Sequence, residues 1–406
     1  MFGFKKPVST DKDKIYELLE RGVSAIYPSR EFLEQRLKSG EKLTVYLGID
    51  PTGETLHLGH AIALRKLAEF QALGHQVILL FGDFTATIGD PTDKTSVRVS
   101  LSRKEVLQNA KRYKQQASHL LGFHGANPAV LKYNSQWLAK MSMSDMTKLF
   151  SSITYAQTIK RNMFQKRIAE DKDLFLHEFM YPVLQGYDSV AMEVDGEVGG
   201  NDQVFNMLVG RDLMKKIKNK EKFVIATKLL TDPSGKKMGK TEGNMVSLDE
   251  TAEQMFGKIM SWSDDLILTG FELCTTMTLG EIADVKTKLE QGMNPRDAKI
   301  RLAREVVSLY HGLAEAQKAE KRFEGAFSKS EFPADAPFKE VTVGTPLSDA
   351  LVGIVASNSE FSRLISEGAV YDFKTNQKIA DRKTLVSRDM DMRIGKHRFV
   401  RLKVIL

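Results

Sequence analysis

The sequence predicts an α/β fold with a doubly wound parallel sheet, followed by an all-α domain and a small α+β module. Residues 43–81 read as strand, helix and strand, which is the βαβ unit of a parallel sheet. Residues 248–327 carry apolar side chains at helical spacing, and residues 393–406 alternate as a β-ribbon does. A chain of 406 residues suits roughly two to three domains.

The first βαβ unit indicates where a ligand would bind. Residues 11–40 precede it and are predicted to be helical, with a break at Pro28 and Ser29. Leu43–Ile49 is the first strand, residues 58–73 form a helix that Gly74 ends, and Gln76–Phe81 is the second strand. The loop after the first strand therefore lies at the carboxyl edge of a parallel sheet, where doubly wound folds bind ligands.

Two histidines mark the start of that helix. His57 and His60 are three residues apart, and in a first helical turn they can direct ring N–H groups and the helix dipole at an anion. The same spacing suits an HxxH metal pair or two unrelated surface histidines. The sequence HLGH alone does not decide between these interpretations.

The rest of the first domain combines a long loop with further helices and strands. Residues 82–98 are rich in small and turn-forming residues, and so long a loop inside a compact domain is usually functional. A helix is predicted at 103–120, a strand at Ala129–Tyr133, and mainly helix beyond it. The run KKIKNKEK, residues 215–222, is predicted to be a solvated helix face, with RNA contact as the alternative.

Two polar patterns in this domain are candidates for a binding site. Tyr181, Gln185 and Asp188 share one face of a helix within about 40°, with Pro182 expected in its first turn. They either line a pocket or form a solvated face. In VGGNDQ, residues 198–203, a Gly-Gly bend lets the backbone approach a ligand while a carboxylate accepts from hydroxyls, as with ribose. The same residues also suit an ordinary turn.

A lysine-rich loop follows the strand predicted at Phe223–Leu230. Residues 232–244, DPSGKKMGKTEGN, combine glycines with lysines. Lysines on a flexible backbone suit the charge of a triphosphate or pyrophosphate. The loop lacks the spacing of a P-loop, and in isolation it could be an exposed loop without a role.

The C-terminal part divides into helices, a linker and a basic module. Helices are predicted at 279–289, 298–313 and 315–327, and residues 329–345 read as a linker. Residues 346–406 carry eleven Lys or Arg against seven Asp or Glu, a local charge of +4. Either RNA binding or a solvated surface explains this excess. The side chains offered to phosphates are Lys396, Arg398, Arg401 and Lys403.

Composition limits the class of protein. The net charge of +7 is a weak indication of a polyanionic partner. Cys274 is the sole cysteine, which excludes an internal disulfide and a cysteine-clustered zinc site. No apolar run approaches the roughly 18 residues of a membrane helix, and MFGFKK lacks the apolar core of a signal peptide. The sequence therefore predicts a cytoplasmic protein without membrane contact.

Four motifs in order resemble one family. YLGIDPTGETLHLGH is similar to the HIGH region of class I aminoacyl-tRNA synthetases, and KKMGKT is similar to their KMSKS loop. YPVLQGYD and GGNDQ resemble segments of the bacterial tyrosyl-tRNA synthetases. The resemblance extends from about Tyr46 to the C-terminus. It departs at Gly239 (serine in the KMSKS motif), at Leu58 (isoleucine in HIGH), and at residues 358–363, which are less basic than is usual in S4-like domains.

The resemblance implies a domain plan and a set of site residues. The implied plan is a Rossmann-like catalytic domain with a helical insertion at 1–230, a KMSKS-type loop linker at 231–247, a helical anticodon-side domain at 248–328, a linker at 329–345 and an S4-like RNA-binding domain at 346–406. The residues implied for tyrosine binding are Tyr46, Asp90, Tyr181, Gln185 and Asp188. Those implied for catalysis are Thr52, His57, His60, Lys94, Arg98, Lys237, Lys240 and Thr241. Those implied for ATP binding are Gly48, Asp50, His57, His60, Gly200, Asp202, Gln203 and Lys240.

The resemblance also implies a reaction. The chain would join L-tyrosine to ATP as tyrosyl-adenylate and transfer the tyrosyl group to the 3′-terminal ribose of tRNA(Tyr), releasing AMP and pyrophosphate. Mg²⁺ would accompany the ATP phosphates, no protein-bound metal is expected, and the protein would be a homodimer. Phenylalanine would be rejected, because the Asp188 carboxylate beside Tyr46 would then lose its partner.

Three rival functions account for less of the sequence. A tryptophanyl-type enzyme of the same class fits less well, because Tyr46 and Asp188 suit a hydroxyl and an indole has none. An RNA-binding protein derived from a synthetase would normally have lost its phosphate motifs, which are intact here. A nucleotidylyltransferase can share the helix-start histidines but is not expected to combine them with the lysine loop, the helical domain and the basic tail.

Overall fold

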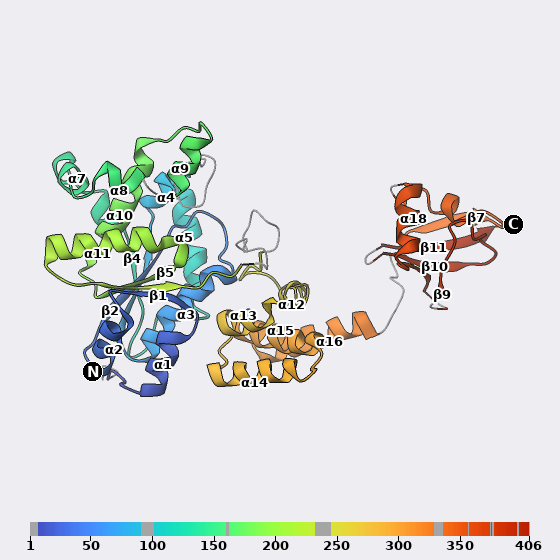
Figure 1. Cartoon of the computed structure of the whole chain (residues 1–406), viewed down its shortest axis with the longest axis horizontal. Helices are drawn as coiled ribbons and strands as arrows, with labels where there is room; N and C mark the ends of the chain where they lie inside the picture. Colours follow the sequence, from blue (N-terminus) through green and yellow to red (C-terminus); the bar gives the residue numbers. More distant parts are fainter. Residues whose placement is uncertain are drawn as a thin grey trace. The chain divides into compact units, whose positions relative to one another are not determined.

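The computed structural model divides into two compact units, residues 1–320 and 321–406 (Figure 1). The residues that it describes are 7–90, 101–159, 162–231, 245–328, 336–355, 357–373, 375, 377–395 and 398–405. The larger unit holds a sheet with helices on both faces, and the smaller one has a sheet of its own.

The larger unit is built on a six-stranded sheet with the order β1-β6-β5-β2-β3-β4. Its strands are β1 (Val23–Tyr27), β2 (Thr44–Ile49), β3 (Gln76–Phe81), β4 (Val130–Tyr133), β5 (Gly196–Gly200) and β6 (Phe223–Thr227). All neighbouring pairs are parallel except β1 and β6, which are antiparallel. The chain moves outward from β2 to β4 and then returns to β5 on the other side of β2. The predicted parallel sheet is confirmed, and its switch point lies between β2 and β5.

Helices cover both faces of this sheet. The helices in this part of the chain are α1 (Lys12–Glu20), α2 (Arg30–Lys38), α3 (Leu58–Ala72), α4 (Thr85–Ile88), α5 (Arg103–Ala117), α6 (Ser135–Leu138), α7 (Met143–Phe150), α8 (Tyr155–Ile159), α9 (Asn162–Ala169), α10 (Leu176–Met192), the 3₁₀ turn η1 (Asn201–Gln203) and α11 (Val204–Lys218). Figure 1 shows α3 on one face and α10 and α11 on the other. Strands covered in this way are apolar along their whole length, and all five residues of β6, FVIAT, are buried.

The N-terminal region has the two predicted helices and the break at Pro28 and Ser29, since Ser29 caps α2, but residues 21–27 correct the prediction of helix. Gly22, with a φ of 62°, follows α1, and β1 then separates α1 from α2. The β1 sequence VSAIY does not alternate between buried and exposed residues, so its pattern does not mark it as a strand. It becomes one by pairing with β6, which is far away along the chain.

The position of Pro182 is also a correction, because it lies inside α10 rather than in its first turn. The helix begins earlier, at Leu176, where the Glu178 carboxylate accepts from the backbone N–H of Phe175 at 3.2 Å. A proline inside a helix removes one backbone hydrogen bond. The helix nevertheless continues to Met192, so its polar residues still share one side.

Residues 252–328 form helices, as predicted for this region. They are α12 (Ala252–Met260), α13 (Leu266–Cys274), α14 (Leu279–Glu290), α15 (Pro295–His311) and α16 (Leu313–Ser328). Two guanidinium groups hold the C-terminal end of α13. Arg21 donates to the carbonyl of Glu272 at 3.0 Å, and Arg65 on α3 donates to the carbonyl of Leu273. Cations suit this position because the last carbonyls of a helix carry partial negative charge.

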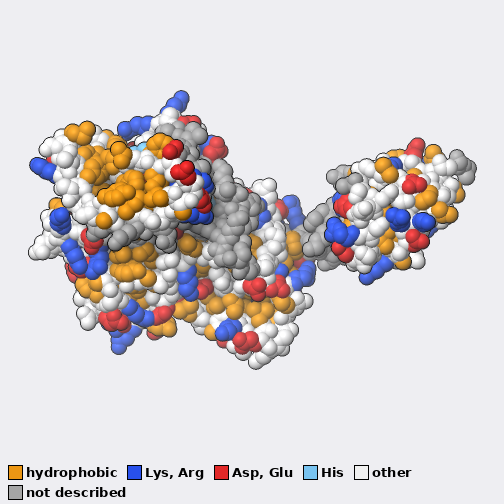
Figure 2. Space-filling view, turned by 45° about the horizontal axis from the view of Figure 1, so that its top comes forward, with side chains coloured by type: hydrophobic (Ala, Val, Ile, Leu, Met, Phe, Trp, Pro, Cys, Tyr) orange, Lys and Arg blue, Asp and Glu red, His pale blue; other side chains and the backbone are white. Residues whose placement is uncertain are grey.

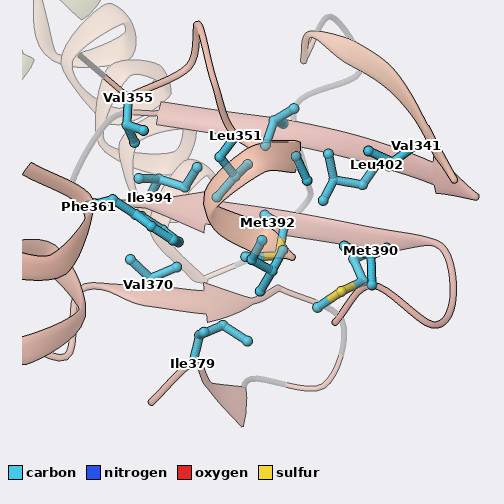
Figure 3. Packing of buried hydrophobic residues seen from close by; sticks show 14 of the residues in the cluster. Val341, Leu351, Val355, Phe361, Val370, Ile379, Met390, Met392, Ile394 and Leu402 are labelled. Atoms are coloured by element: carbon cyan, nitrogen blue, oxygen red, sulfur yellow. The ribbon is translucent and has the colours of Figure 1, made fainter. Parts of the chain in front are cut away.

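The smaller unit has a sheet with the order β7-β11-β10-β8-β9. Its elements are β7 (Phe338–Thr342), α17 (Leu347–Ala350), α18 (Asn358–Ser366), β8 (Val370–Asp372), β9 (Gln377–Lys378), β10 (Met390–Ile394) and β11 (Arg398–Ile405). Figure 3 shows its core, in which buried apolar side chains from α18 and the sheet pack together, among them Phe361, Val370, Met392, Ile394 and Leu402.

The antiparallel pair β10 and β11 confirms the ribbon predicted near the C-terminus. β7, in contrast, lies inside residues 329–345, which were expected to be a linker. It pairs in parallel with β11 and so belongs to the sheet of the smaller unit. Within the described ranges, no helix combines the length and the apolar character needed to cross a membrane.

Candidate active site

A cavity of about 350 Å³ lies at the carboxyl ends of β2 and β5, at the switch point of the sheet. Every predicted site residue within the described ranges lines it: Tyr46, Gly48, Asp50, Thr52, His57, His60, Asp90, Tyr181, Gln185, Asp188, Gly200, Asp202 and Gln203. The other predicted residues lie outside the described ranges: Lys94, Arg98, Lys237, Lys240 and Thr241. The structure therefore brings the first loop and both polar patterns together.

The two histidines are oriented by the first turn of α3. His57 is the N-cap residue, and its Nδ1 accepts from the Gly59 N–H at 3.1 Å. The Nδ1 of His60 accepts from the His57 N–H at 3.3 Å, and the two ring centroids are 3.9 Å apart. We therefore assign the proton of each neutral ring to Nε2. An imidazole N–H at a helix N-terminus suits an anion such as phosphate.

The alternative interpretation of His57 and His60, a pair of metal ligands, can be compared with their surroundings in the described part of the chain. Both Nδ1 atoms already accept from backbone N–H groups. No three His, Cys, Asp or Glu side chains come together as metal ligands in the part of the chain that the structure describes.

The segment that follows the predicted lysine loop packs against the start of α3. The N–H of Leu58 donates to the carbonyl of Val246 at 3.0 Å, and that of Leu248 donates to the carbonyl of Leu56 at 2.9 Å. On the other side of the loop, Leu230 lines the cavity. Both flanks of residues 232–244 therefore lie beside the histidines or the cavity.

Asp188 supplies a buried carboxylate to the cavity, and only 3% of it is exposed. Its Oδ1 accepts from Trp137 Nε1 at 2.8 Å, and its Oδ2 accepts from Asn134 Nδ2 at 3.3 Å. Burial raises the pKa of Asp188 well above its usual value, while these two donors act in the opposite direction. Both partners favour the carboxylate form, which accepts from each of them.

Tyr46 places a phenol in the same part of the cavity. Its ring is fully buried, and its Oη lies 2.9 Å from Ser189 Oγ. Ser189 Oγ accepts from Lys222 Nζ at 2.9 Å, and Lys222 is ion-paired with Glu197. Burial, followed by the charges of Glu197 and Asp188, raises the pKa of Tyr46 well above its usual value. The phenol therefore remains protonated at neutral pH.

Asp50, at the end of β2, is held by two hydroxyl groups. Tyr181 Oη donates to Asp50 Oδ2 at 2.8 Å, and Thr85 Oγ1 donates to Asp50 Oδ1 at 2.7 Å. Gly82 makes room for this carboxylate, because a Cβ there would lie 2.0 Å from Asp50 Oδ1. Asp50 thus fixes the Tyr181 hydroxyl within the cavity.

A chain of amides connects the remaining predicted residues. Gln203 Nε2 donates to Asp90 Oδ2 at 2.7 Å, and Asn206 Nδ2 lies 3.0 Å from the Oε1 atoms of both Gln203 and Gln185. Carboxylates and amide oxygens gathered in this way suit an ammonium group.

Gly199 and Gly200 end the strand β5, which corrects the prediction of a bend, and Gly200 lies beside the Asp202 carboxylate. A Cβ on Gly200 would lie 2.4 Å from Asp202 Oδ1, so glycine is the residue that fits here. Both residues line the cavity. A carboxylate next to an open backbone suits recognition of vicinal hydroxyls such as those of ribose.

Sequence reasoning missed several contributors to this site: Thr85, Asn134, Trp137, Ser189, Glu197, Asn206 and Lys222. Lys222 is also a correction, since it is the last residue of the run predicted to be a solvated helix face. The helix α11 ends at Lys218, and Lys222 is fully buried. The available signal was Glu197, a charge within the buried strand β5 that requires a partner.

The family model for tRNA synthetases class I (W and Y) matches residues 38–328. The chain is 41% identical to tyrosine–tRNA ligase 2 of Vibrio parahaemolyticus, over 95% of this chain and 97% of that protein. It is 42% identical to the tyrosine–tRNA ligase of Carboxydothermus hydrogenoformans, with the same coverage.

Solved structures agree in fold. A C-terminally truncated mitochondrial tyrosyl-tRNA synthetase of Aspergillus nidulans matches with a TM-score of 0.68 and 22% identity, covering 78% of this chain and 95% of that one. The tyrosyl-tRNA synthetase of Archaeoglobus fulgidus, complexed with L-tyrosine, matches with a TM-score of 0.60 and 21% identity, covering 76% and 98%. Together with the near-full-length relatives, the family match shows that the chain belongs to the class I tRNA synthetases, among the tyrosyl-tRNA synthetases of bacterial type.

Proposed function

We propose that the chain activates L-tyrosine with ATP as tyrosyl-adenylate and transfers the tyrosyl group to the 3′-terminal ribose of tRNA(Tyr). Both substrates of the first step would bind in the cavity at the carboxyl ends of β2 and β5. The observation that carries the choice of amino acid is the buried pair of Tyr46 and Asp188 in one cavity with the α3 histidines. AMP and pyrophosphate are the products released.

A phenolic hydroxyl satisfies both members of this pair. It donates to the Asp188 carboxylate and accepts from the Tyr46 hydroxyl, whereas an indole N–H only donates and a phenyl ring does neither. A bound phenylalanine would give the Asp188 carboxylate no donor and the Tyr46 hydroxyl no acceptor from the substrate side. The substrate ammonium is assigned to the polar group of Asp90, Tyr181 and Gln185.

The nucleotide is assigned to the other part of the cavity. The nucleoside is assigned to Gly48, Asp50, Gly200, Asp202 and Gln203, and Asp50 also accepts from the Tyr181 hydroxyl. Thr52, His57 and His60 receive the phosphates at the start of α3. Lys94, Arg98, Lys237, Lys240 and Thr241 are proposed to act with them, and Mg²⁺ arrives with ATP.

The reaction then needs no protein nucleophile. The tyrosine carboxylate attacks the α-phosphorus, and pyrophosphate leaves. The protein contributes by holding the two substrates in line and by placing cations and helix-terminal N–H groups against the charge of the transition state.

Tyrosine-dependent ATP–pyrophosphate exchange tests this function. Exchange is expected with tyrosine and not with phenylalanine or tryptophan. Exchange with tryptophan would overturn the assignment of Tyr46 and Asp188. No exchange with any of the three, from folded protein, would favour an RNA-binding protein without synthetase activity.

The smaller unit is proposed to be an S4-like RNA-binding domain. Its support is the separate α+β core and the local charge of +4 over residues 346–406. Part of that charge is engaged within the unit, since Arg398 pairs with Glu360 at 2.7 Å and Arg401 with Asp391 at 3.0 Å. Lys403 is exposed. Phosphate contacts of this kind add affinity without reading sequence.

Truncation separates the two steps of the reaction. A chain of residues 1–328 is expected to retain ATP–pyrophosphate exchange, because the cavity lies entirely in the larger unit. Charging of tRNA(Tyr) is expected to fall by about tenfold or more as phosphate contacts are lost. Aminoacylation with labelled tyrosine measures the second step. Full charging by the truncated chain would contradict an RNA-binding role for the smaller unit.

A homodimer is proposed from an apolar surface on the larger unit. Leu176 is 84% exposed, Met143 83% and Tyr155 70%, and Ile168 and Phe175 are exposed as well. Figure 2 shows hydrophobic side chains gathered over the region where Figure 1 places α7, α8 and α10. An exposed apolar patch of this kind marks a protein interface.

Leu176→Asp is therefore expected to convert the dimer to a monomer. The buried interface would have to desolvate a carboxylate in each copy. Sedimentation equilibrium measures the mass. Leu385→Asp is the matched control, since Leu385 is an exposed leucine of the smaller unit, 56% accessible, and its change is expected to leave the dimer intact. A monomeric unaltered protein, or a dimeric Leu176→Asp variant, would contradict this interface.

A further inference from the structure

A charged lysine lies fully buried beneath the cavity. Lys222 immediately precedes β6, and its ammonium is ion-paired with Glu197 of β5 and donates to Ser189 Oγ of α10 at 2.9 Å. None of the Lys222 side chain is exposed. Gly210 of α11 makes room for it, because a Cβ there would lie 2.7 Å from Lys222 Nζ. The strand β5 and two helices from one face of the sheet, α10 and α11, thus meet at this ammonium.

Stability alone gives little reason for such a group. Burying an ion pair has a large desolvation cost, and an apolar pair of similar volume is often as stable or more so. The pair is also not isolated, since Ser189 connects it to the hydroxyl of Tyr46. The chain Glu197, Lys222, Ser189 and Tyr46, called here the Lys222 network, runs from a buried charge to the cavity wall.

We propose that Lys222 and Ser189 are positioning residues for tyrosine recognition, which orient the Tyr46 hydroxyl so that it donates to the phenolic oxygen of the substrate. The inference rests on the proposed function and deepens it. It assigns specificity to residues that lie behind Tyr46 rather than in contact with the amino acid.

The direction of the hydrogen bonds follows from the donors present. An ammonium has only protons to give, so Ser189 Oγ accepts from Lys222. The cation makes Ser189 a poorer acceptor of a second proton and a better donor. Ser189 therefore donates to Tyr46 Oη, and the phenol proton of Tyr46 is directed to another acceptor.

The carboxylate of Glu197 is the competing acceptor for that proton. Without substrate, the Tyr46 hydroxyl interacts with Glu197, whose Oε2 also accepts from Lys222 and whose Oε1 accepts from Gln185 Nε2 at 3.3 Å. Lys222 thus both neutralises Glu197 and polarises Ser189. The hydroxyl of the bound tyrosine then donates to Asp188 and accepts from the Tyr46 hydroxyl, so that both of its hydrogen bonds are made.

Ser189→Ala tests the inference in the full-length protein by ATP–pyrophosphate exchange. The KM for tyrosine is expected to rise about tenfold, with kcat and the KM for ATP little changed. In a Tyr46→Phe background, the same Ser189→Ala change is expected to have no further effect on KM, because Ser189 acts only through the Tyr46 hydroxyl. Ser189→Cys, which keeps the volume but weakens the hydrogen bond, is expected to fall between the two and guards against a folding defect.

The matched control is Ser308→Ala. Ser308 on α15 is also a helical serine, with a buried Oγ that has no hydrogen-bond partner among the described residues. Its removal is expected to leave the KM for tyrosine unchanged. A loss of equal size for Ser189→Ala in both Tyr46 backgrounds, or an unchanged KM, would overturn the inference. An unaltered protein without tyrosine-dependent exchange would instead overturn the proposed function on which it rests.

Discussion

Asp188→Asn is expected to lower kcat/KM for tyrosine in ATP–pyrophosphate exchange by about 100-fold. The carboxylate is 3% exposed and has one oxygen toward Trp137 Nε1 and the other toward Asn134 Nδ2. An amide keeps only one acceptor oxygen, so its NH₂ group would face one of these donors or the substrate hydroxyl. The substrate hydroxyl then loses a charged acceptor that is almost fully buried.

The control for this variant is Asp212→Asn. Asp212 is an exposed residue of α11, so its neutralisation removes the same charge from the protein surface. The KM for ATP should be unaffected in both variants, since Asp188 is assigned to the amino acid. If Asp188→Asn kept the kcat/KM of the unaltered protein, the phenol would have to bind elsewhere in the cavity.

Lys222→Met is expected to lower the free energy of unfolding of the larger unit by about 3–5 kcal/mol, because it leaves Glu197 buried without its counter-charge. Tryptophan fluorescence during urea unfolding is a suitable measurement. The chain has two tryptophans, and Trp137 and Trp262 both lie in the larger unit. The signal therefore reports that unit alone.

A second change separates charge from packing. Lys222→Met combined with Glu197→Gln should recover most of the lost stability, since no buried charge then remains unpaired. Lys216→Met, at an exposed position of α11, should stay within about 0.5 kcal/mol of the unaltered protein. A double variant no more stable than Lys222→Met would show that the methylene packing of Lys222, and not its charge, supports the fold.

The cavity could be predicted from the sequence because its residues belong to local motifs that one topology brings together. A βαβ unit places residues 50–60 at the carboxyl edge of the sheet, and the polar pattern on α10 keeps its period despite Pro182. These are local signals, and the switch point assembles them. The roles of individual residues remain predictions until the variants above are measured.

What the sequence could not indicate are the features created by distant contacts. From the sequence, Lys222 belongs to a run of charged residues, whereas in the fold it is buried by contacts with β5 and α10. The β1 segment is a strand because it pairs with β6. Trp137 and Asn134 belong to no motif, and their role follows from the position of Asp188. The β7 segment likewise is a strand because it pairs with β11.

The hydrogen bonds from Arg21 and Arg65 to the C-terminal end of α13 couple the movement of this helix to that of α3. Arg65 follows His60 by five residues on α3, so the helix carries both at a separation of roughly 8 Å along its axis. α3 is one continuous helix, and Arg65 at its middle donates to the carbonyl of Leu273 at the C-terminal end of α13. If α13 moved, either these hydrogen bonds would break or α3 would move with it, together with the imidazoles of His57 and His60. Strain applied to the helices beyond residue 252 would therefore reach the part of the cavity that His57 and His60 line.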